Sequence, residues 1–270
     1  ININGVSSKL ENDTCVNFFK AYDIVMLNEL KCDYPFSMPG FKCIRSDVIP
    51  GEDRRGGVAV LFKTALWDNV FNVKTYKDQI WFSLASVRDI RFGAVYITPR
   101  DSPFYSPQSF SVIQAECIAH EYKTLILVDM NARIPDLNNF DKPNSGISYH
   151  RNVDTRGNAN GRELTLIMDS CRLNPLNHMR MDGKQFGGGF TFKQKSQWIS
   201  QLDWALCSLD ILCDVISFNV MQNDVLPTNH APITLTLACD NVSHSDLLTR
   251  ATDLGQSILP KQPSQQAAVS

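Results

Sequence analysis

Short apolar runs dominate this chain, and segments with helical periodicity are few. Each run is long enough for one strand and is bounded by glycine, proline or polar residues. The expected strands are residues 24–27, 41–45, 57–63, 80–87, 92–97, 124–128, 202–207, 215–220 and 233–237. Helical patterns cover only residues 15–22, 106–122 and 161–171. This ratio predicts an α/β fold, a four-layered sandwich of two packed mixed β-sheets flanked by helices.

The composition is that of an ordinary globular protein. Of the 270 residues, 43% are hydrophobic and 20% are charged. The formal net charge is −2, so a nucleic-acid enzyme of this kind would need a local basic groove. The sequence contains no signal-peptide pattern and no long apolar run, which favours an intracellular protein without membrane attachment. The eight cysteines form no CxxC pair, and we expect reduced, structural thiols.

The texture of the sequence changes near Cys239. Residues 1–239 show no shift in composition and are expected to form one domain. The chain opens with Ile inside a strand-like ININ, so we expect this domain to be excised from a longer protein. Residues 244–258 have an amphipathic helical pattern, and the following Gln/Pro/Ser-rich end is typical of disorder. We interpret residues 240–270 as a linker or disordered tail towards another module.

The run LILVDMNAR, residues 125–133, places Asp129 and Asn131 at the carboxyl end of an apolar strand. Ligands of open α/β sheets bind at that end. A carboxylate there can accept a proton from an attacking water, and a carboxamide can hydrogen-bond a phosphate or hold that water. Taken alone, such a run more often marks a turn or a helix cap.

Polar residues stand at the tips of other apolar runs in the same manner: Asn2, Asn4, Glu29, Tyr96, Asp203, Asn229 and His230. Each has a plain structural alternative. Glu29 could be a solvated loop charge, Tyr96 a core aromatic residue with a wet tip, and His230 a turn residue. The joint occurrence of these residues, rather than any one of them, indicates a site.

The order of the landmarks carries a resemblance to a known family. NING, NEL, RGGVAVL, VYITP, LVDMNAR, NANGRELTLIMDSCRL, FTF, QLDWAL and TNHAPI follow one another over residues 1 to 238. This set resembles the endonuclease/exonuclease/phosphatase superfamily and, within it, the apurinic-type endonuclease domain of non-LTR (LINE-type) retrotransposons. The resemblance implies a DNase I-like fold and a Mg²⁺-dependent DNA endonuclease, with Mn²⁺ as an alternative ion. It also implies double-stranded DNA as partner, fusion to a reverse transcriptase module and action in the nucleus, and leaves the oligomeric state open.

The same resemblance implies a cation site of oxygen ligands. Glu29 would be the main carboxylate ligand of Mg²⁺, which prefers hard oxygen donors. Asn4 and Asn229 would lie at the same metal pole, and Asn2 beside it would hold phosphate or metal-bound water. The ion would neutralise the developing 3′ alkoxide, and the nick would leave a 3′-OH that primes reverse transcription.

The catalytic roles follow from the resemblance as well. Asp129 would orient or deprotonate the attacking water, and Asn131 would hydrogen-bond the scissile phosphate or that water. His230 would donate to a non-bridging phosphate oxygen, with Asp203 fixing its tautomer and orientation. Tyr96 would contact the phosphate near the leaving oxygen.

The chain departs from the family pattern at two positions. Val128 stands where the family usually has Gly, which is a modest change at the strand end. Asn229 stands where the family usually has Asp before the histidine. An amide keeps a carbonyl ligand but loses a negative charge, so we predict weakened or altered metal dependence rather than an inactive site.

DNA contacts are expected on both sides of the site. Residues 193–201, KQKSQWISQ, predict a hairpin or loop beside it, in which Lys193 and Lys195 meet phosphates and Trp198 wedges at the minor groove. The alternative is a solvated loop with Trp198 returning to the core. Further phosphate-contact candidates are Arg100 and Arg133, which flank the site, and Arg54 and Arg55 in a glycine-rich loop.

Other functions stay open at this stage. The chain could be a catalytically weakened or inactive nuclease-fold binding module, which Asn229 favours, or a repair-type apurinic endonuclease. VDMNAR also resembles the GDxNxR segment of inositol-polyphosphate 5-phosphatases, but the aromatic-rich PxWxDR motif of that family reads SQLDWAL here. A nicking assay on supercoiled DNA distinguishes an enzyme from a binding module.

Overall fold

The computed structural model describes residues 1–32, 34–46, 56–87, 90–120, 123–222 and 226–239. The expected tail at 240–270, with its helical pattern at 244–258, lies outside the described residues, as do Arg54 and Arg55. Within the described ranges, no helix combines the length and the apolar character needed to cross a membrane.

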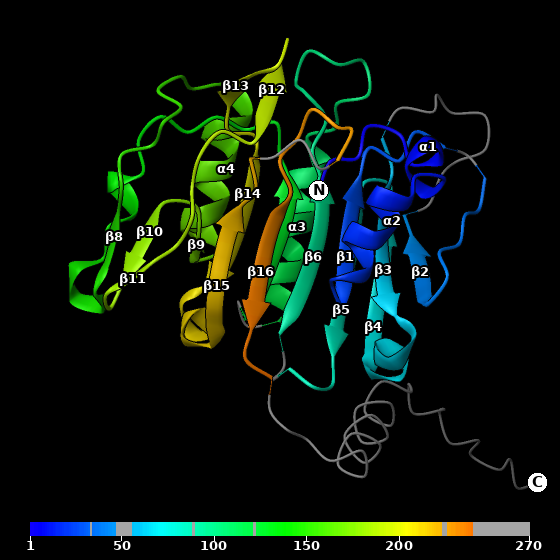
Figure 1. Ribbon diagram of the computed structural model, residues 1–270. Helices are drawn as coiled ribbons and strands as arrows, with labels where there is room; N and C mark the ends of the chain where they lie inside the picture. Colours follow the sequence, from blue (N-terminus) through cyan, green and yellow to red (C-terminus); the bar gives the residue numbers. More distant parts are fainter. Residues whose placement is uncertain (33, 47–55, 88–89, 121–122, 223–225, 240–270) are drawn as a thin grey trace, which may run out of the picture.

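A six-stranded mixed sheet forms the centre of the molecule (Figure 1). In spatial order its strands are β4 (Val70–Tyr76), β5 (Gln79–Leu84), β6 (Arg91–Tyr96), β7 (Thr124–Asp129), β14 (Asp203–Ser208) and β9 (Leu173–Pro175). Strands β6 and β7 pair in parallel, and all other neighbours in this sheet are antiparallel. The parallel pair places the ends of β6 and β7 at the same edge, which is the edge that carries the site.

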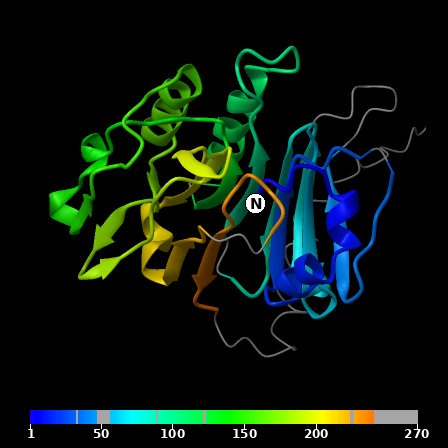
Figure 2. The same cartoon turned by 45° about the horizontal axis from the view of Figure 1, so that its top comes forward.

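A second β-layer packs against one face of this sheet (Figure 2). One part is the antiparallel sheet of β1 (Ile24–Asn28), β3 (Val58–Lys63) and β2 (Phe41–Arg45). The other part is the antiparallel pair β15 (Val215–Val220) and β16 (Ile233–Leu237). The expected second mixed sheet is therefore divided into two antiparallel groups, and residue Asn2 adds a parallel bridge to Asn28 at the end of β1.

Strand periodicity divides the buried side chains between two cores. On β3, Val58, Val60 and Phe62 face the large core between the two β-layers, while Ala59 and Leu61 face a smaller core on the outside. Successive side chains of a strand point to opposite faces, so a wholly apolar run such as VAVLF can fill both cores at once. This explains why the strand has no polar alternation, with residues 58–62 all buried.

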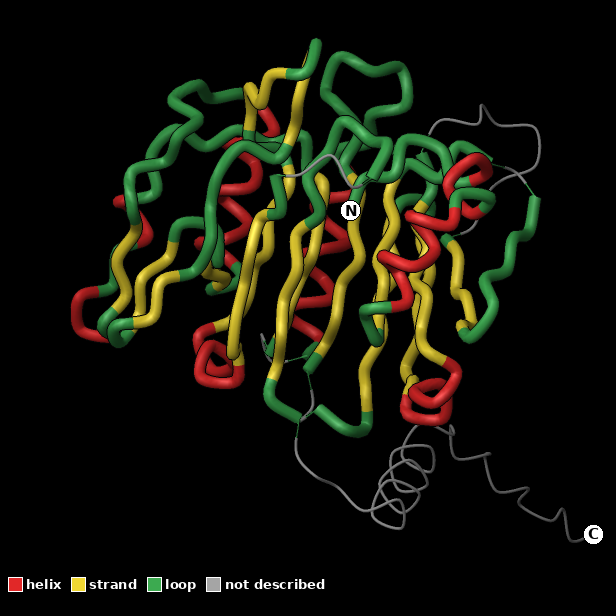
Figure 3. Tube along the Cα trace, in the orientation of Figure 1, coloured by secondary structure: helices red, strands yellow, loops and turns green. Residues whose placement is uncertain are grey.

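Helices cover the outer face of each β-layer (Figure 3). The short α1 (Ser7–Leu10) and α2 (Asp13–Lys20) lie over β1 and β3, where Cys15 and Phe19 enter the smaller core. On the far side, α3 (Gln108–Ala119) and α4 (Ala159–Ser170) pack on the six-stranded sheet. The predicted four-layered α/β sandwich is thus confirmed.

The remaining elements are short. A small sheet consists of β8 (Ile147–Tyr149), β10 (Met179–Met181) and β11 (Lys184–Gln185), and β12 (Phe192–Gln194) and β13 (Gln197–Ser200) form a separate hairpin. Short 3-10 helices cover Thr64–Asn69, Asn138–Phe140, Pro143–Ser145 and Leu209–Asp214. The hairpin that the sequence predicted between Phe192 and Leu202 is confirmed, with Lys195 and Ser196 both at positive φ in its tight turn.

Each strand expected from the sequence is present within a few residues, but β4 and the short strands β8 to β11 were not predicted. Of these, β4 is the longest. This edge strand carries a register irregularity between Phe71 and Lys74, with Asn72 in the left-handed region at φ 52°. A bulge interrupts the two-residue period, and an edge strand needs no buried face, so both sequence signals are lost.

Candidate active site

Three predicted site residues lie in one row across neighbouring strands. Tyr96 at the end of β6 is in register with Asp129 at the end of β7, and Asp129 is in turn opposite Asp203, the first residue of β14. All three are buried. The strand ends therefore bring together residues that are far apart in the sequence, as the parallel β6–β7 pair requires.

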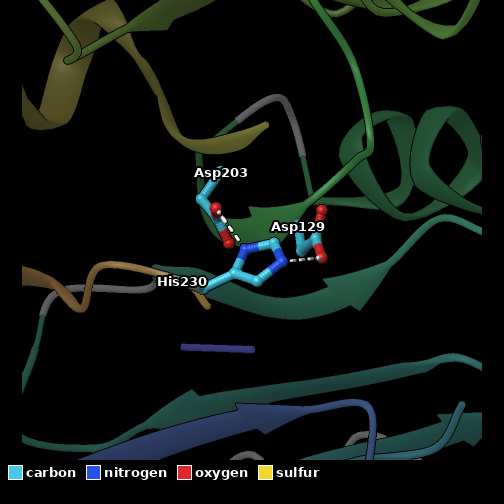
Figure 4. A group of neighbouring side chains, drawn as sticks. All are labelled: Asp129, Asp203 and His230. Carbon is cyan, nitrogen blue, oxygen red and sulfur yellow. Dashed lines mark hydrogen bonds and ion pairs between the residues drawn. The ribbon is translucent and has the colours of Figure 1, made fainter. Parts of the chain in front are cut away.

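His230 completes this row from the loop before β16 (Figure 4). Its Nδ1–H donates to Asp203 Oδ2 at 2.8 Å, and its Nε2 lies 4.0 Å from Asp129 Oδ2. A carboxylate can only accept, so the Nδ1 position carries a proton and the Nε2 edge is directed towards Asp129. Below, the histidine half of the site means Asp129, Asp203 and His230.

Burial and neighbouring charges together set the ionisation of the histidine half. Burial opposes the charged form of His230, but the attraction of Asp203 and Asp129 outweighs it and raises the pKa of His230 to about 9. Burial, together with the negative charge of Asp203, raises the pKa of Asp129 to about 7, although His230 and a hydrogen bond from Asn2 oppose this shift. At neutral pH the imidazole is thus cationic, and the Asp129 carboxyl is poised to exchange a proton.

The loop around His230 is held by Thr191 of the FTF segment. The hydroxyl oxygen of Thr191 accepts from the backbone N–H groups of Leu202 and Asp203 at 2.8 and 2.9 Å, and its carbonyl accepts from Ala231 N–H at 2.8 Å. Phe192 packs edge-on against the His230 ring, with 5.1 Å between ring centroids. One buried threonine therefore couples the backbone of Asp203 to the backbone beside its histidine partner.

Glu29 approaches the same row from the end of β1. Its Oε1 accepts from the Tyr96 hydroxyl at 2.8 Å, and its Oε2 lies 3.2 Å from the ammonium of Lys31. That ammonium also donates to Asn4 Oδ1 at 2.6 Å. Burial, Asp129 and Glu29 raise the pKa of Tyr96, so its hydroxyl remains a neutral donor. The glutamate half of the site comprises Asn4, Glu29 and Lys31.

Four of the ten non-glycine residues with positive φ in the described part of the chain lie at or beside the site. Asn4, Glu29, Lys31 and Asn131 all have φ between 46° and 55°, in the left-handed region that non-glycine residues seldom adopt. Such conformations persist only where surrounding contacts hold them, and they concentrate at functional sites.

The two remaining asparagines near the site differ in environment. Asn2 is buried, and its side-chain N–H donates to Asp129 Oδ2 at 2.8 Å. Asn229 is exposed, and its carbonyl accepts from Lys193 N–H at 2.8 Å. Asn2 is thus part of the histidine half, whereas the part that Asn229 takes at the metal pole remains a prediction.

Asn131 is positioned by a residue to which sequence reasoning assigned no role, Asn158 of the NANG segment. Asn158 Nδ2 donates to the Asn131 carbonyl at 2.7 Å, and its Oδ1 accepts from Arg133 N–H and from Gly161 N–H at 3.0 and 2.8 Å. The last of these bonds caps α4. Gly161 is required because a Cβ there would lie 2.1 Å from the Arg133 carbonyl oxygen. An asparagine directly before a helical pattern was the sequence signal for this cap.

The predicted phosphate contacts fall into two groups. The guanidinium of Arg133 forms a two-pronged ion pair with buried Asp154, at 2.8 and 2.6 Å, so its main contact is structural. Arg100 is half exposed, packs over the Tyr105 ring, and lies 3.7 Å from Glu163. Its guanidinium is more accessible to a ligand than that of Arg133, although contact with phosphate stays a prediction for both.

The β12–β13 hairpin carries the other group. The Lys193 ammonium lies 5.5 Å from the centre of the Trp198 ring, so this tryptophan stays on the hairpin, half-buried, instead of entering the core. Lys195 is exposed at the tip. Because Phe192 bridges to His230, the hairpin stands directly beside the histidine half, where the sequence placed it.

Two places in the site could accept a cation. Among the described residues, the Asp129, Asp203 and His230 ligand atoms lie within 4.8 Å of one another, close enough to share an ion. Those atoms already pair with each other, and a protonated imidazole repels a metal. The glutamate half instead presents two oxygen ligands that already hold a cation, the Lys31 ammonium. Hard oxygen donors around a positive charge fit Mg²⁺ better than the buried histidine half does.

Comparison with known proteins identifies the fold. No family model matches the sequence, and no curated protein matches it. Solved structures do match. The Neisseria 3′ phosphatase NExo bound to product DNA hairpin aligns at 18% identity over 88% of this chain and 97% of that one, with a TM-score of 0.62. The endonuclease domain of TRAS1, a telomere-specific non-LTR retrotransposon, aligns at 14% identity over 89% and 97%, with a TM-score of 0.56.

The AP endonuclease LMAP from Leishmania major aligns at 12% identity over 87% of this chain and 85% of that one, with a TM-score of 0.63. These neighbours are named as nucleases or as a DNA 3′ phosphatase. The resemblance drawn from the sequence is confirmed at the level of the fold. The chain has the DNase I-like α/β sandwich of the endonuclease/exonuclease/phosphatase proteins.

Proposed function

We propose that the chain is a Mg²⁺-dependent endonuclease of a retroelement, which nicks target DNA and leaves a 3′-OH for reverse transcription. The observation that carries the proposal is the convergence of Glu29, Tyr96, Asp129, Asp203 and His230 at one sheet edge through a continuous series of contacts. These residues come from five separate segments of the sequence. A merely structural cluster would not need two carboxylates, a cationic imidazole and a strained glutamate together.

Asp129 is the proton acceptor in this mechanism. It takes a proton from a water as the water oxygen bonds to phosphorus and the bond from phosphorus to the 3′ oxygen breaks. The released 3′ oxygen takes up a proton from solvent and becomes the 3′-OH. The raised pKa of Asp129, about 7, matches this task because a base works best when its pKa is near the working pH. Asn2 and the N–H of Asn131 each donate to one Asp129 oxygen and fix the orientation of the carboxylate.

His230 stabilises the charge that builds on the phosphate. Asp203 holds the imidazolium through Nδ1 and directs Nε2–H towards the reacting group. The neutral hydroxyl of Tyr96 lies beside Glu29 and would contact the leaving side of the phosphate. Glu29 and Asn4, with Asn229, would hold the divalent ion, which when bound neutralises charge on the leaving 3′ oxygen.

Several parts of the proposal come from the sequence resemblance. These are the retroelement setting, the fusion through residues 240–270 to a reverse transcriptase module, and action in the nucleus. The TRAS1 endonuclease domain supports the setting, because it has this fold at nearly full coverage. A second solved neighbour is an AP endonuclease, so cleavage at abasic sites is the competing activity.

The test is a nicking assay on supercoiled plasmid with Mg²⁺. We expect open-circle product from the wild type, and extension of its ends by a DNA polymerase, which requires a 3′-OH. Glu29→Ala removes the single carboxylate of the expected ion site and should lower the rate at least roughly a hundred-fold. Equal background nicking by both proteins would contradict the proposal. Faster cleavage of an abasic duplex than of intact plasmid would assign the repair activity instead.

A further inference from the structure

The glutamate half contains a cation of its own, the side chain of Lys31. The Lys31 ammonium is 2.6 Å from Asn4 Oδ1 and 3.2 Å from Glu29 Oε2. These are oxygens of two of the side chains expected to hold the divalent ion. An ammonium is a compact point charge with three donors, so it can occupy two such oxygens at once.

The backbone conformation brings Lys31 next to Glu29. Glu29 and Lys31 both have positive φ, 55° and 50°, and the chain between them is pinned by hydrogen bonds from Leu30 N–H to Gly57 and from Lys31 N–H to Gly56. The paired left-handed residues bring the side chains of positions 29 and 31 together. An extended strand would also place them on one face, but it would not fold the lysine back over the strand end.

The contact with Lys31 neutralises the side chains that are expected to hold the divalent ion. Glu29 is the single carboxylate among Asn4, Glu29 and Asn229, because the other two are amides. The ammonium of Lys31 therefore cancels the whole formal charge of that ligand set. A divalent ion arriving at the free protein meets a formally neutral ligand set in which Asn4 Oδ1 and both Glu29 carboxylate oxygens already have partners.

We propose that Lys31 is a tethered competitor for the divalent ion, which keeps metal affinity low in the free protein. The inference rests on the proposed function for the location of the ion site. Binding of the ion requires the ammonium to leave Glu29 and Asn4. A DNA phosphate supplies the missing negative charge and a new partner for the released ammonium, so metal and DNA bind with positive coupling.

The test measures metal binding without DNA, by Mn²⁺ electron paramagnetic resonance and by calorimetry with Mg²⁺. Lys31→Met should bind Mn²⁺ roughly three- to ten-fold more tightly than the wild type, because a competing charge is removed from a partly solvated site. Lys9→Met is the matched control. The Lys9 ammonium donates to the backbone carbonyl of Asn4, at 3.2 Å, and not to a side-chain oxygen expected to hold the ion, and its loss changes the net charge equally. We expect unchanged affinity for this variant.

The double variant Lys31→Met/Glu29→Ala tests whether the gain in Mn²⁺ affinity depends on Glu29. We expect the double variant to lose this gain. Equal affinities of Lys31→Met and Lys9→Met, weaker binding by Lys31→Met, or no binding by any variant would overturn the inference. The nicking assay reports separately on the proposed function. If the wild type nicks but Lys31→Met binds Mn²⁺ no more tightly, the competitor role of Lys31 is refuted and the proposed function stands. If Lys31→Met binds Mn²⁺ more tightly but the wild type does not nick, the nuclease function is refuted and the competitor role stands.

Discussion

The two halves of the site are built in opposite ways. In the histidine half, Asp129, Asp203 and His230 are buried, come from paired strands and the loop braced by Thr191, and hydrogen-bond or pair with one another. In the glutamate half, Glu29 and Lys31 have side chains 22% and 38% exposed, and Asn4 is exposed as well. The first half is preorganised, whereas the second can exchange one cation for another.

This difference indicates a division of work. A buried network of charges costs desolvation when the protein folds, and in return it needs no rearrangement during the reaction. A partly exposed carboxylate paired with a lysine loses less hydration when the protein folds, and it can rearrange more easily. Substitutions in the histidine half should therefore act on the rate of the chemical step, and substitutions in the glutamate half on metal dependence.

The largest effect is expected from His230→Ala. Loss of the imidazolium removes the donor to the phosphate and leaves Asp203 buried without its partner, so nicking should fall roughly a thousand-fold. The plasmid assay measures the rate, and circular dichroism checks the fold. His120→Ala is the control, since His120 lies at the end of α3 beside Glu116, before the start of β7. Comparable losses in both variants would remove His230 from the mechanism.

The next effect concerns pH. Asp129 must be deprotonated to accept a proton, and its raised pKa makes the rate climb through about pH 7. His230 must stay protonated to donate, and its raised pKa makes the rate fall above about pH 9. We expect a bell-shaped profile of single-turnover rate between these limits, with about a ten-fold loss per pH unit well below 7. A rate that stays constant from pH 5 to 7 would show that Asp129 is not the base.

A smaller effect is expected from Asn158, which both positions the Asn131 loop and stabilises α4. Asn158→Ala removes the cap of α4 and releases the Asn131 loop, so we expect a loss of about 1 kcal/mol in stability and roughly a ten-fold lower rate. Asn12→Ala is matched to it, because Asn12 caps α2, which packs on the other β-layer, by accepting from Cys15 N–H at 3.2 Å. It should cost similar stability in chemical denaturation and leave the rate unchanged.

The smallest effect tests the expected ion site through Asn229, which lies outside the glutamate half. Asn229→Asp adds a second carboxylate to the expected ion site, and it should lower the Mg²⁺ concentration for half-maximal nicking roughly three- to ten-fold. The single-turnover rate at saturating Mg²⁺ should change little, because the histidine half is untouched. A large change in that saturated rate with no change in Mg²⁺ requirement would break the division between the two halves.

Much of this arrangement could be predicted from the sequence. Apolar runs identified the strands of both β-layers, and polar residues at their tips identified Glu29, Tyr96, Asp129, Asp203 and His230 as neighbours. Both signals are local, because strand periodicity and the end of a strand are properties of a few consecutive residues. The hairpin beside the site was also predictable, since its turn residues follow a short alternating run.

Other features depend on partners that no local pattern names. Arg133, for which a phosphate contact stays a prediction, pairs with Asp154. Thr191 and Asn158 brace the site from segments that earlier served only as landmarks. Edge strand β4 was not predicted because its bulge interrupts the two-residue period of a strand. Each of these outcomes was set by which side chains meet across the packed layers.

The sequence by itself determined the sandwich and the set of reactive side chains, because apolar periodicity and strand ends are encoded residue by residue. The tertiary structure alone decided how charge is distributed among them. Paired left-handed residues bring Lys31 onto Glu29 and Asn4, and strand register brings Asp203 and Asp129 onto His230. The sequence contains these charged residues, but only the folded backbone makes the histidine half a closed network and the glutamate half an exchangeable cation site.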